Sequence, residues 1–221
     1  MVKVDFHTHS VASPDGSITL QQYSRVLALQ KLDCIAITDH NRIDFAQYAQ
    51  KQLGSDKIIV GEEITTTEGE IIGLYLSQEI PAGLSLKATI KLIKEQGGII
   101  YVPHPFETVR KGLSIDSLDS IQSSVDMIET QNGRAFFQNF GPRAQTWATA
   151  NKVSQASSSD AHRWQGLGRT YTELATLPTR KNLPVLAMQA TQQYKQPLML
   201  DIIAPKRNKL VKRLSRKRRY S

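Results

Sequence analysis

The stretch Asp5-Phe6-His7-Thr8-His9 closes the first apolar run of the chain, residues 2–6. If this run is a β-strand, its period of two places His7 and His9 on one face, side by side where the strand ends. Two imidazoles in that position can bind one metal ion. A single histidine near an N-terminus is more often a surface polar residue, so the metal hypothesis depends on the other histidines.

The remaining histidines also follow apolar runs. The chain has only five, and the other three are found in Thr38-Asp39-His40, Pro103-His104-Pro105 and Asp160-Ala161-His162. Each follows a strand-like segment, and two of them have an aspartate within two residues. Histidines that served only as surface polar groups would not all fall at such places, so the pattern indicates a cluster.

Strand-like and helix-like segments alternate through most of the sequence. Short apolar runs lie at residues 2–6, 34–37, 58–60, 70–76, 99–102, 125–128, 153–156 and 171–174, with helical patterns at 20–32, 43–53, 86–96, 116–123, 142–151 and 183–194. Short apolar strands that are each followed by a helix predict parallel βαβ units. We expect an α/β fold that closes into a TIM-like barrel, with the polar motifs at one mouth because functional residues gather at the C-terminal ends of barrel strands.

Length and composition predict one domain. A chain of 221 residues, 40% hydrophobic, can bury one substantial core. It contains no apolar run near the roughly 18 residues that would span a bilayer, and it begins on a strand pattern rather than a signal peptide, so we expect a cytoplasmic protein. The single cysteine, Cys34, excludes an intramolecular disulfide and is expected to be a small buried side chain.

The net charge of +8 is concentrated in residues 206–221. This segment carries nine of the 28 Lys and Arg residues and no acidic residue, which leaves 19 basic and 20 acidic residues elsewhere. Because a block of like charge repels itself, we expect a near-neutral domain over 1–205 and a flexible, disordered basic tail over 206–221. Such a tail could bind nucleic acid or an anionic surface.

The clustered residues favour metal chemistry. Imidazole and carboxylate together suit Zn, Mn or Fe. A mononuclear site needs three or four ligands, and the chain offers about nine candidates, which indicates two or three divalent ions. Metals lower the pKa of a bound water and neutralise charge on a transferring phosphoryl group, so the chemistry expected is hydrolysis of a phosphate ester.

The order His7-x-His9, Asp15, Thr38-Asp39-His40, Gly61-x-Glu63, His104-Pro105 and Asp160-x-His162 resembles the polymerase and histidinol phosphatase (PHP) family of phosphoesterases. Each motif alone is weak, but the ordered set is specific and covers roughly residues 2–175. The resemblance implies a distorted (β/α)7 barrel.

The resemblance also implies how the ligands are shared. His7, His9, Glu63 and Asp160 would hold one metal and act in catalysis through its bound water. Asp15, His40 and His162 would hold another, and Glu63 would bridge to a third held partly by His104. Members of the family usually have a further histidine where this sequence has Glu70, a substitution that would favour a harder ion such as Mn or Mg.

Other polar residues allow more than one interpretation. Glu129 and Asn132 lie at the end of a strand on the same rim. They could support the metal ligands or bind substrate, or they could simply cap a loop. Arg110, Lys111, Arg134 and Arg163 could bind phosphate, although a solvated surface charge is the commoner role of any one of them. We assign Arg163, Arg134 and Asn132 as candidate substrate-binding residues.

Three functions remain in competition. The first is a phosphomonoesterase acting on a small molecule or a nucleotide, with a fairly open mouth because residues 70–104 leave no room for a lid domain. The second is a nuclease or nucleotide-end trimming enzyme that uses the same metals and the basic tail. The third is a non-catalytic module whose tail, with Leu210, Val211 and Leu214 as an apolar stripe, docks on RNA or an anionic membrane.

Overall fold

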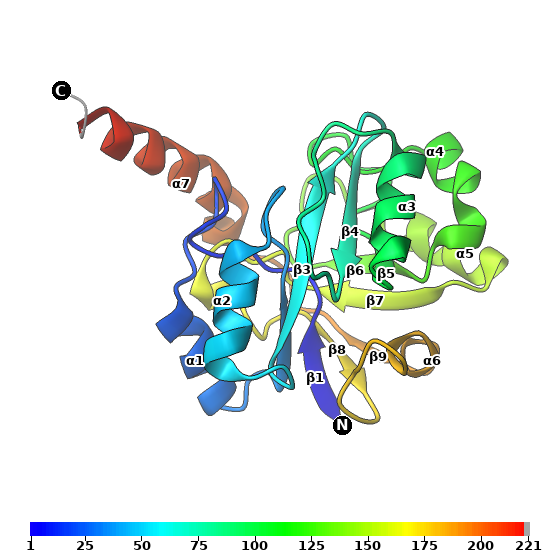
Figure 1. Ribbon diagram of the computed structural model, residues 1–221, viewed down its shortest axis with the longest axis horizontal. Helices are drawn as coiled ribbons and strands as arrows, with labels where there is room; N and C mark the ends of the chain where they lie inside the picture. The colour runs from blue at the N-terminus through cyan, green and yellow to red at the C-terminus, as the bar shows by residue number, and fades with distance from the viewer. Residues whose placement is uncertain (219–221) are drawn as a thin grey trace.

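A single mixed β-sheet forms the centre of the computed structural model, which describes residues 1–218 (Figure 1). Its nine strands are ordered β7-β6-β5-β4-β3-β2-β1-β8-β9. The strands are β1 (Val2–Asp5), β2 (Cys34–Ile37), β3 (Ile58–Thr65), β4 (Glu70–Leu74), β5 (Ile99–Val102), β6 (Met127–Asn132), β7 (Ser154–Ser158), β8 (Tyr171–Leu174) and β9 (Thr191–Gln193).

Helices cover the outside of this sheet (Figure 1). They are α1 (Leu20–Ala28), α2 (Asp44–Leu53), α3 (Leu86–Glu95), α4 (Ile115–Ser120), α5 (Gly141–Asn151), α6 (Leu183–Ala187) and α7 (Met199–Arg218), with short 3-10 turns at Gln122–Ser124 and Trp164–Gly166. Local sequence explains several of their ends. Thr19 and Gln22 form a capping box before α1, and Gly97, at a φ of 65°, follows the last turn of α3.

The sheet curls until its two ends approach one another. Beyond β7, the backbone N–H of Ser159 donates to Asp5 Oδ1 at 3.0 Å, and His9 N donates to Ala161 O at 2.9 Å. Within β7, Ser157 N donates to Thr172 Oγ1 of β8 at 2.9 Å. These contacts join the first and last thirds of the chain, and the α/β barrel-like fold predicted from the sequence is confirmed.

The prediction that the strands are all parallel is wrong at two of them. β4 runs antiparallel to both of its neighbours, β3 and β5, and β8 is antiparallel to β1. The helix predicted over 183–194 is also wrong in its second half, since α6 ends at Ala187 and β9 pairs antiparallel with β8. The connection between β3 and β4 spans only residues 66–69. A parallel crossover needs a dozen or more residues, so this short connection can form only a hairpin.

Alternate side chains of the strands contribute to two apolar cores. Cys34 and Ala36 of β2 belong to an inner cluster with Phe6 and Tyr101, whereas Ile35 and Ile37 belong to the cluster shared with the outer helices. This alternation is what a strand buried on both faces produces. Cys34 is 1% exposed, as expected, and burial raises the pKa of its thiol to about 12.

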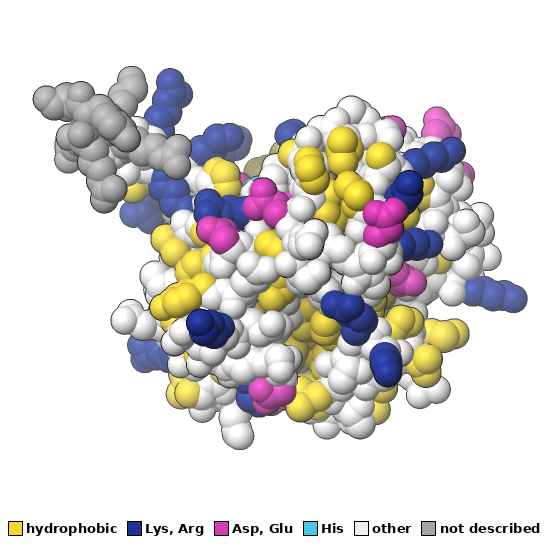
Figure 2. Space-filling model, viewed as in Figure 1, with side chains coloured by type: hydrophobic (Ala, Val, Ile, Leu, Met, Phe, Trp, Pro, Cys, Tyr) yellow, Lys and Arg dark blue, Asp and Glu magenta, His cyan; other side chains and the backbone are white. Residues whose placement is uncertain are grey.

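The C-terminal basic segment is helical over its described part. Residues 206–218 belong to helix α7, which begins at Met199, before the proposed domain boundary at 205/206. Residues 219–221 lie outside the described residues. The first part of α7 packs on the barrel through Ala204, 5% exposed, and its later part projects from the body with basic side chains around it (Figures 1 and 2).

Side-chain contacts explain why the repulsion within this segment does not prevent the helix. Asn208 and Lys212 donate hydrogen bonds to backbone carbonyls of the barrel, which supply the negative ends of dipoles to a positively charged helix. Leu210, Val211 and Leu214 are exposed on it. Within residues 1–218, no helix combines the length and apolar character needed to cross a membrane.

Candidate metal centre

All nine metal-ligand candidates converge at one end of the barrel. Seven lie on strands or directly after them, at β1, β2, β3, β5, β7 and the first residue of β4. Of the other two, Asp15 lies on the loop between β1 and α1 and His162 lies shortly beyond β7. Together they form overlapping clusters in which one ligand atom per residue lies within 4.8 Å of the others: His7, His9, Asp15, His40, Glu63, Glu70, His104, Asp160 and His162.

Four of these residues, His7, His9, Glu63 and Asp160, form what we call the inner group. The Nε2 atoms of His7 and His9 lie 3.1 Å apart. Glu63 Oε2 lies 3.4 and 3.2 Å from these two nitrogens, and Asp160 Oδ1 lies 3.6 and 3.4 Å from them. Ligand atoms about 2.0–2.1 Å from one tetrahedral ion lie about 3.3 Å from one another. The spacing of His7, His9 and Glu63 therefore fits a single metal ion, and Asp160 lies beside the two histidines.

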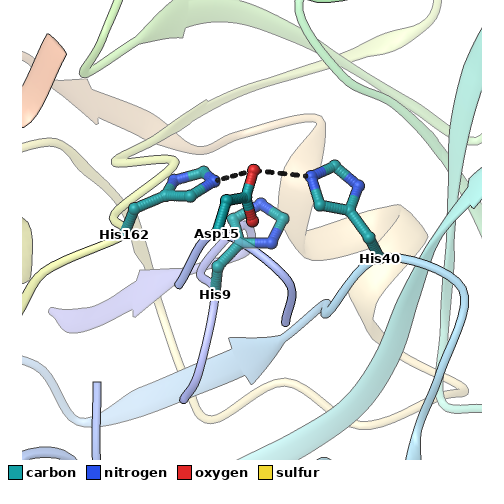
Figure 3. Close-up of side chains that lie close together, drawn as sticks. All are labelled: His9, Asp15, His40 and His162. Atoms are coloured by element: carbon teal, nitrogen blue, oxygen red, sulfur yellow. Dashed lines mark ion pairs between the residues drawn. The ribbon is translucent and has the colours of Figure 1, made fainter. Parts of the chain in front are cut away.

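Asp15, His40 and His162 form the outer group (Figure 3). Asp15 Oδ2 lies 3.4 Å from His40 Nε2 and 3.4 Å from His162 Nε2, so both rings point at the same carboxylate oxygen. The ring of His9 stacks on that of His162 with centroids 4.1 Å apart, which brings the two groups into contact. A second ion fits between these three side chains.

A third group consists of Glu63, Glu70 and His104. Glu63 turns its other oxygen, Oε1, to His104 Nε2 at 2.9 Å, so its two oxygens face two different groups. Glu70 lies 3.9 Å from His40 and is 6% exposed. Burial, followed by repulsion from Glu63, raises the pKa of Glu70 to about 7. A cation beside these two carboxylates would relieve that repulsion.

Electrostatics of the cluster favour a cation. Burial lowers the pKa of His9, but hydrogen bonds that its ring donates to Asp160 and Glu63 outweigh this effect and raise the pKa to about 10. Burial opposes ionisation of Asp160, yet the nearby charge of Arg134 holds its pKa well below the usual range. The pKa of His162 falls to about 3 through burial and the positive charge of His9. The extra proton of His9 helps to balance the carboxylates, and a divalent ion can replace it.

Comparison with known proteins agrees with this geometry. The model of the PHP domain family matches residues 5–162 of the chain. The chain belongs to the PHP domain family. A relative from Methanocaldococcus jannaschii, MJ0417, is 32% identical over 185 residues, which are 81% of this chain and 73% of the relative.

Solved structures show the same fold. A two-domain protein of Bacteroides vulgatus, which contains a predicted PHP-like metal-dependent phosphoesterase, matches with a TM-score of 0.70 and 20% identity over 87% of this chain, and the match covers 64% of that protein. PsfC of Pseudomonas syringae matches with a TM-score of 0.67 and 16% identity over 96% of this chain and 98% of its own. The resemblance to the PHP family stated from the motifs is thus confirmed.

Glu129 supports the PHP site from behind the inner group. Its Oε1 lies 3.3 Å from His7 Nδ1 and accepts a hydrogen bond from the Tyr101 hydroxyl at 3.2 Å. Its Oε2 accepts from the backbone N–H of His104 and from Asn132 Nδ2, both at 2.7 Å. A carboxylate on the far nitrogen of a ligand histidine fixes the ring and its tautomer. Of the interpretations left open by the sequence, support of the site fits Glu129 best.

The candidate substrate-binding residues of the PHP chain separate into two sets. Arg134 lines the mouth and its Nη1 lies 3.0 Å from Asp160 Oδ2, while Asn132 is 4% exposed and holds Glu129. Arg163 points elsewhere: it lies 3.7 Å from Asp201 of α7 and lines a separate pocket. Proximity to His162 in sequence therefore does not bring Arg163 into the mouth. The structure places Arg110 there instead, 2.7 Å from Asp160.

Sequence reasoning missed two kinds of contributor. Glu107, 5% exposed in the mouth, pairs with Arg110, and the three-residue spacing of these opposite charges was the only signal. The second kind is backbone conformation. His104 and Asp160 have φ values of 28° and 49°, in the left-handed region that residues with side chains rarely adopt. Such strain concentrates at functional sites, and no pattern in the sequence predicts it.

Proposed function

We propose that this PHP protein is a metal-dependent phosphoesterase that hydrolyses phosphate monoesters at a site holding two or three divalent ions. The observation that carries the proposal is the spacing of the inner group, in which His7, His9 and Glu63 could hold one ion next to a mouth lined by cationic side chains. Family membership supports the proposal, and the structurally similar Bacteroides protein contains a predicted PHP-like metal-dependent phosphoesterase.

The donor set of imidazoles and carboxylates fits Zn, Mn or Fe in the inner and outer groups, and the extra carboxylate Glu70 favours a harder ion in the third. When bound, such ions would supply an activated water and neutralise charge on the transferring phosphoryl group. The chain's own contribution is to hold the ligands. Glu129 orients His7, and Glu63 joins two groups.

Cationic side chains would bind and orient the substrate phosphate. Arg110 and Arg134 lie at the edge of the inner group, each on Asp160 Oδ2, and Lys111 lines the same mouth. A planar guanidinium can contact two phosphate oxygens at once. These residues would hold the phosphoryl group against the ligand cluster and exclude part of the water around that group.

The rest of the mouth suits a leaving group with an apolar ring. The cavity has a volume of about 470 Å³, and Phe136 and Phe137, 54% and 81% exposed, line it. Their ring centroids lie 5.0 Å apart in an edge-to-face arrangement. Aromatic faces at a phosphate site can stack on a nucleobase or another ring. We therefore favour a nucleotide or another aromatic phosphate ester over a sugar phosphate.

Phosphate release by the purified protein tests the proposal. The protein, freed of metal and reloaded with Mn²⁺ or Zn²⁺, is assayed against a panel of nucleotide, aromatic and sugar monophosphates, with His7→Ala as the matched control. We expect turnover of at least one monoester by the wild type and none by the variant. Equal rates for both proteins, or no turnover with any metal, would contradict the proposal.

A nuclease using the same metals remains the second candidate, because Lys206 and Lys209 of α7 line the mouth. These lysines could extend the site along a polyanion. Charge-neutral Lys206→Gln and Lys209→Gln variants test this better than truncation, which would also remove Asn208 and Lys212. Unchanged cleavage of a short oligonucleotide, with an unchanged salt dependence, would remove α7 as a binding surface for nucleic acid.

A further inference from the structure

Helix α7 contacts the outer group through the backbone of two of its ligands, Asp15 and His162. Asn208 Nδ2 donates to the carbonyl oxygens of Asp15 at 2.8 Å and His162 at 3.1 Å. The amide has two N–H donors, and these two carbonyls use both. One side chain thus joins two ligand residues that are far apart in sequence.

Lys212 acts on the same loop one helical turn later. Its Nζ donates to the carbonyl oxygens of Val11 and Gly16, each at 2.7 Å, and to that of Ser13. Residues four apart lie on one face of a helix, so Asn208 and Lys212 point the same way. Between them, five carbonyls around the outer group are bound by α7.

The loop that carries Asp15 depends on such contacts because it is not part of the sheet. Its other attachments beyond the loop include Ser17, whose N–H and hydroxyl both donate to His162 O at 3.0 and 2.8 Å. Gly16 leaves no space for a side chain, since a Cβ there would lie 2.1 Å from Ser10 O. The backbone of the loop is therefore packed closely against itself, and the hydrogen bonds from α7 fix its position on the barrel.

The inner group does not depend on hydrogen bonds from α7 in this way. Its residues lie on or directly after strands β1, β3 and β7, and Glu129 of β6 supports them. Of the hydrogen bonds described for residues 1–218, those from α7 to the ligand-bearing backbone end on the Asp15 loop and on His162.

We propose that Asn208 and Lys212 are positioning residues for the ion of the outer group, and that α7 controls its occupancy without affecting the inner ion. The inference rests on the proposed metal site. Loss of a residue that orients ligands typically weakens metal binding about 10- to 100-fold. We expect losses of this size for the outer ion in Asn208→Ala and Lys212→Met, and an unchanged affinity for the inner ion.

Metal titration of the purified full-length variants tests the proposal. Mn²⁺ binding to metal-free protein is followed by calorimetry, and metal content after dialysis by elemental analysis. Arg213→Gln, an exposed neighbour on α7, is the control for charge, and Lys212→Arg, which keeps donors for carbonyls, should restore much of the outer affinity. Hydrogen exchange of the metal-free proteins gives a second measurement, with faster exchange in residues 10–17 and unchanged protection of the strands.

The outcomes separate the two proposals. If the wild type binds Mn²⁺ in two classes and Asn208→Ala and Lys212→Met keep both affinities, the role of α7 is refuted and the metal site stands. If the wild type binds no metal, the proposed function and this inference both fail. Should one variant not fold, the other single variant carries the same test, because each side chain holds the Asp15 loop independently.

Discussion

The inner and outer groups hold similar ligands in different surroundings. The inner group is almost fully buried, with side chains 0–2% exposed, whereas Asp15 and His40 of the outer group are 19% and 22% exposed. Strand ends fix the inner ligands. The outer group takes His40 from the end of β2, but its Asp15 lies on a loop that α7 holds.

This difference shows that one metal cluster can combine a rigid part and an adjustable part. Strand ends are positioned by the whole sheet, so moving the inner group would disturb the barrel core. A loop held by a few side-chain hydrogen bonds can be moved by changing those bonds alone. We expect the inner group to resist substitutions in α7 and the outer group to respond to them.

Replacing Glu63 should have the largest effect, because its two oxygens face the inner and third groups. Glu63→Gln keeps the shape but removes the charge. Since metal ions contribute several kcal/mol to the stabilisation of transition-state charge, we expect kcat to fall about 1,000-fold or more. The measurement is phosphate release with saturating Mn²⁺. A kcat within tenfold of the wild type, roughly 1.4 kcal/mol, would show that the inner group is not the reaction centre.

Asp15→Asn should weaken the outer group alone. The carboxylate lies between His40 and His162 and is the only acidic member of the group. We expect the affinity for one Mn²⁺ ion to fall about 100-fold, while a second ion binds as in the wild type. This loss is at the upper end of that seen when residues that orient metal ligands are replaced. Calorimetric titration checks this, and a parallel loss of both ions would disprove the independence of the two groups.

Glu129→Gln should weaken the inner group by a smaller amount. Glu129 contacts His7 Nδ1 and does not belong to the proposed ligand set, so the ring would lose its charged partner but keep its place. We expect the inner ion to bind about 10- to 100-fold more weakly, with kcat reduced in step. If the outer ion is weakened instead, the assignment of Glu129 to the inner group is wrong.

Glu70→His should have the smallest effect, a change in metal preference. The substitution restores the histidine typical of the family and replaces a hard oxygen ligand by an imidazole. We expect the preference for Zn²⁺ over Mn²⁺ to rise about tenfold at one site, as measured by competition between the ions. An unchanged preference would mean that Glu70 does not contact a metal.

Prediction from sequence succeeded where the information is local. The period of two placed His7 and His9 together, and their Nε2 atoms lie 3.1 Å apart. It failed where partners are distant. The charge pattern of residues 206–221 gave no sign that Lys212 would bind carbonyls of residues 11–16, about 200 positions away. Arg163 illustrates the converse, since sequence proximity to His162 did not set its direction.

The sequence by itself determined the α/β pattern, the PHP family and the set of nine candidate ligands. Strand periodicity depends on neighbouring residues, and the order of motifs can be read directly along the chain. Only the tertiary structure decided the antiparallel direction of β4, the direction of Arg163 and the attachment of α7 to the Asp15 loop. These features depend on contacts between segments far apart in the chain. The energies of these contacts depend on distance and direction in space, which the order of residues along the chain does not specify.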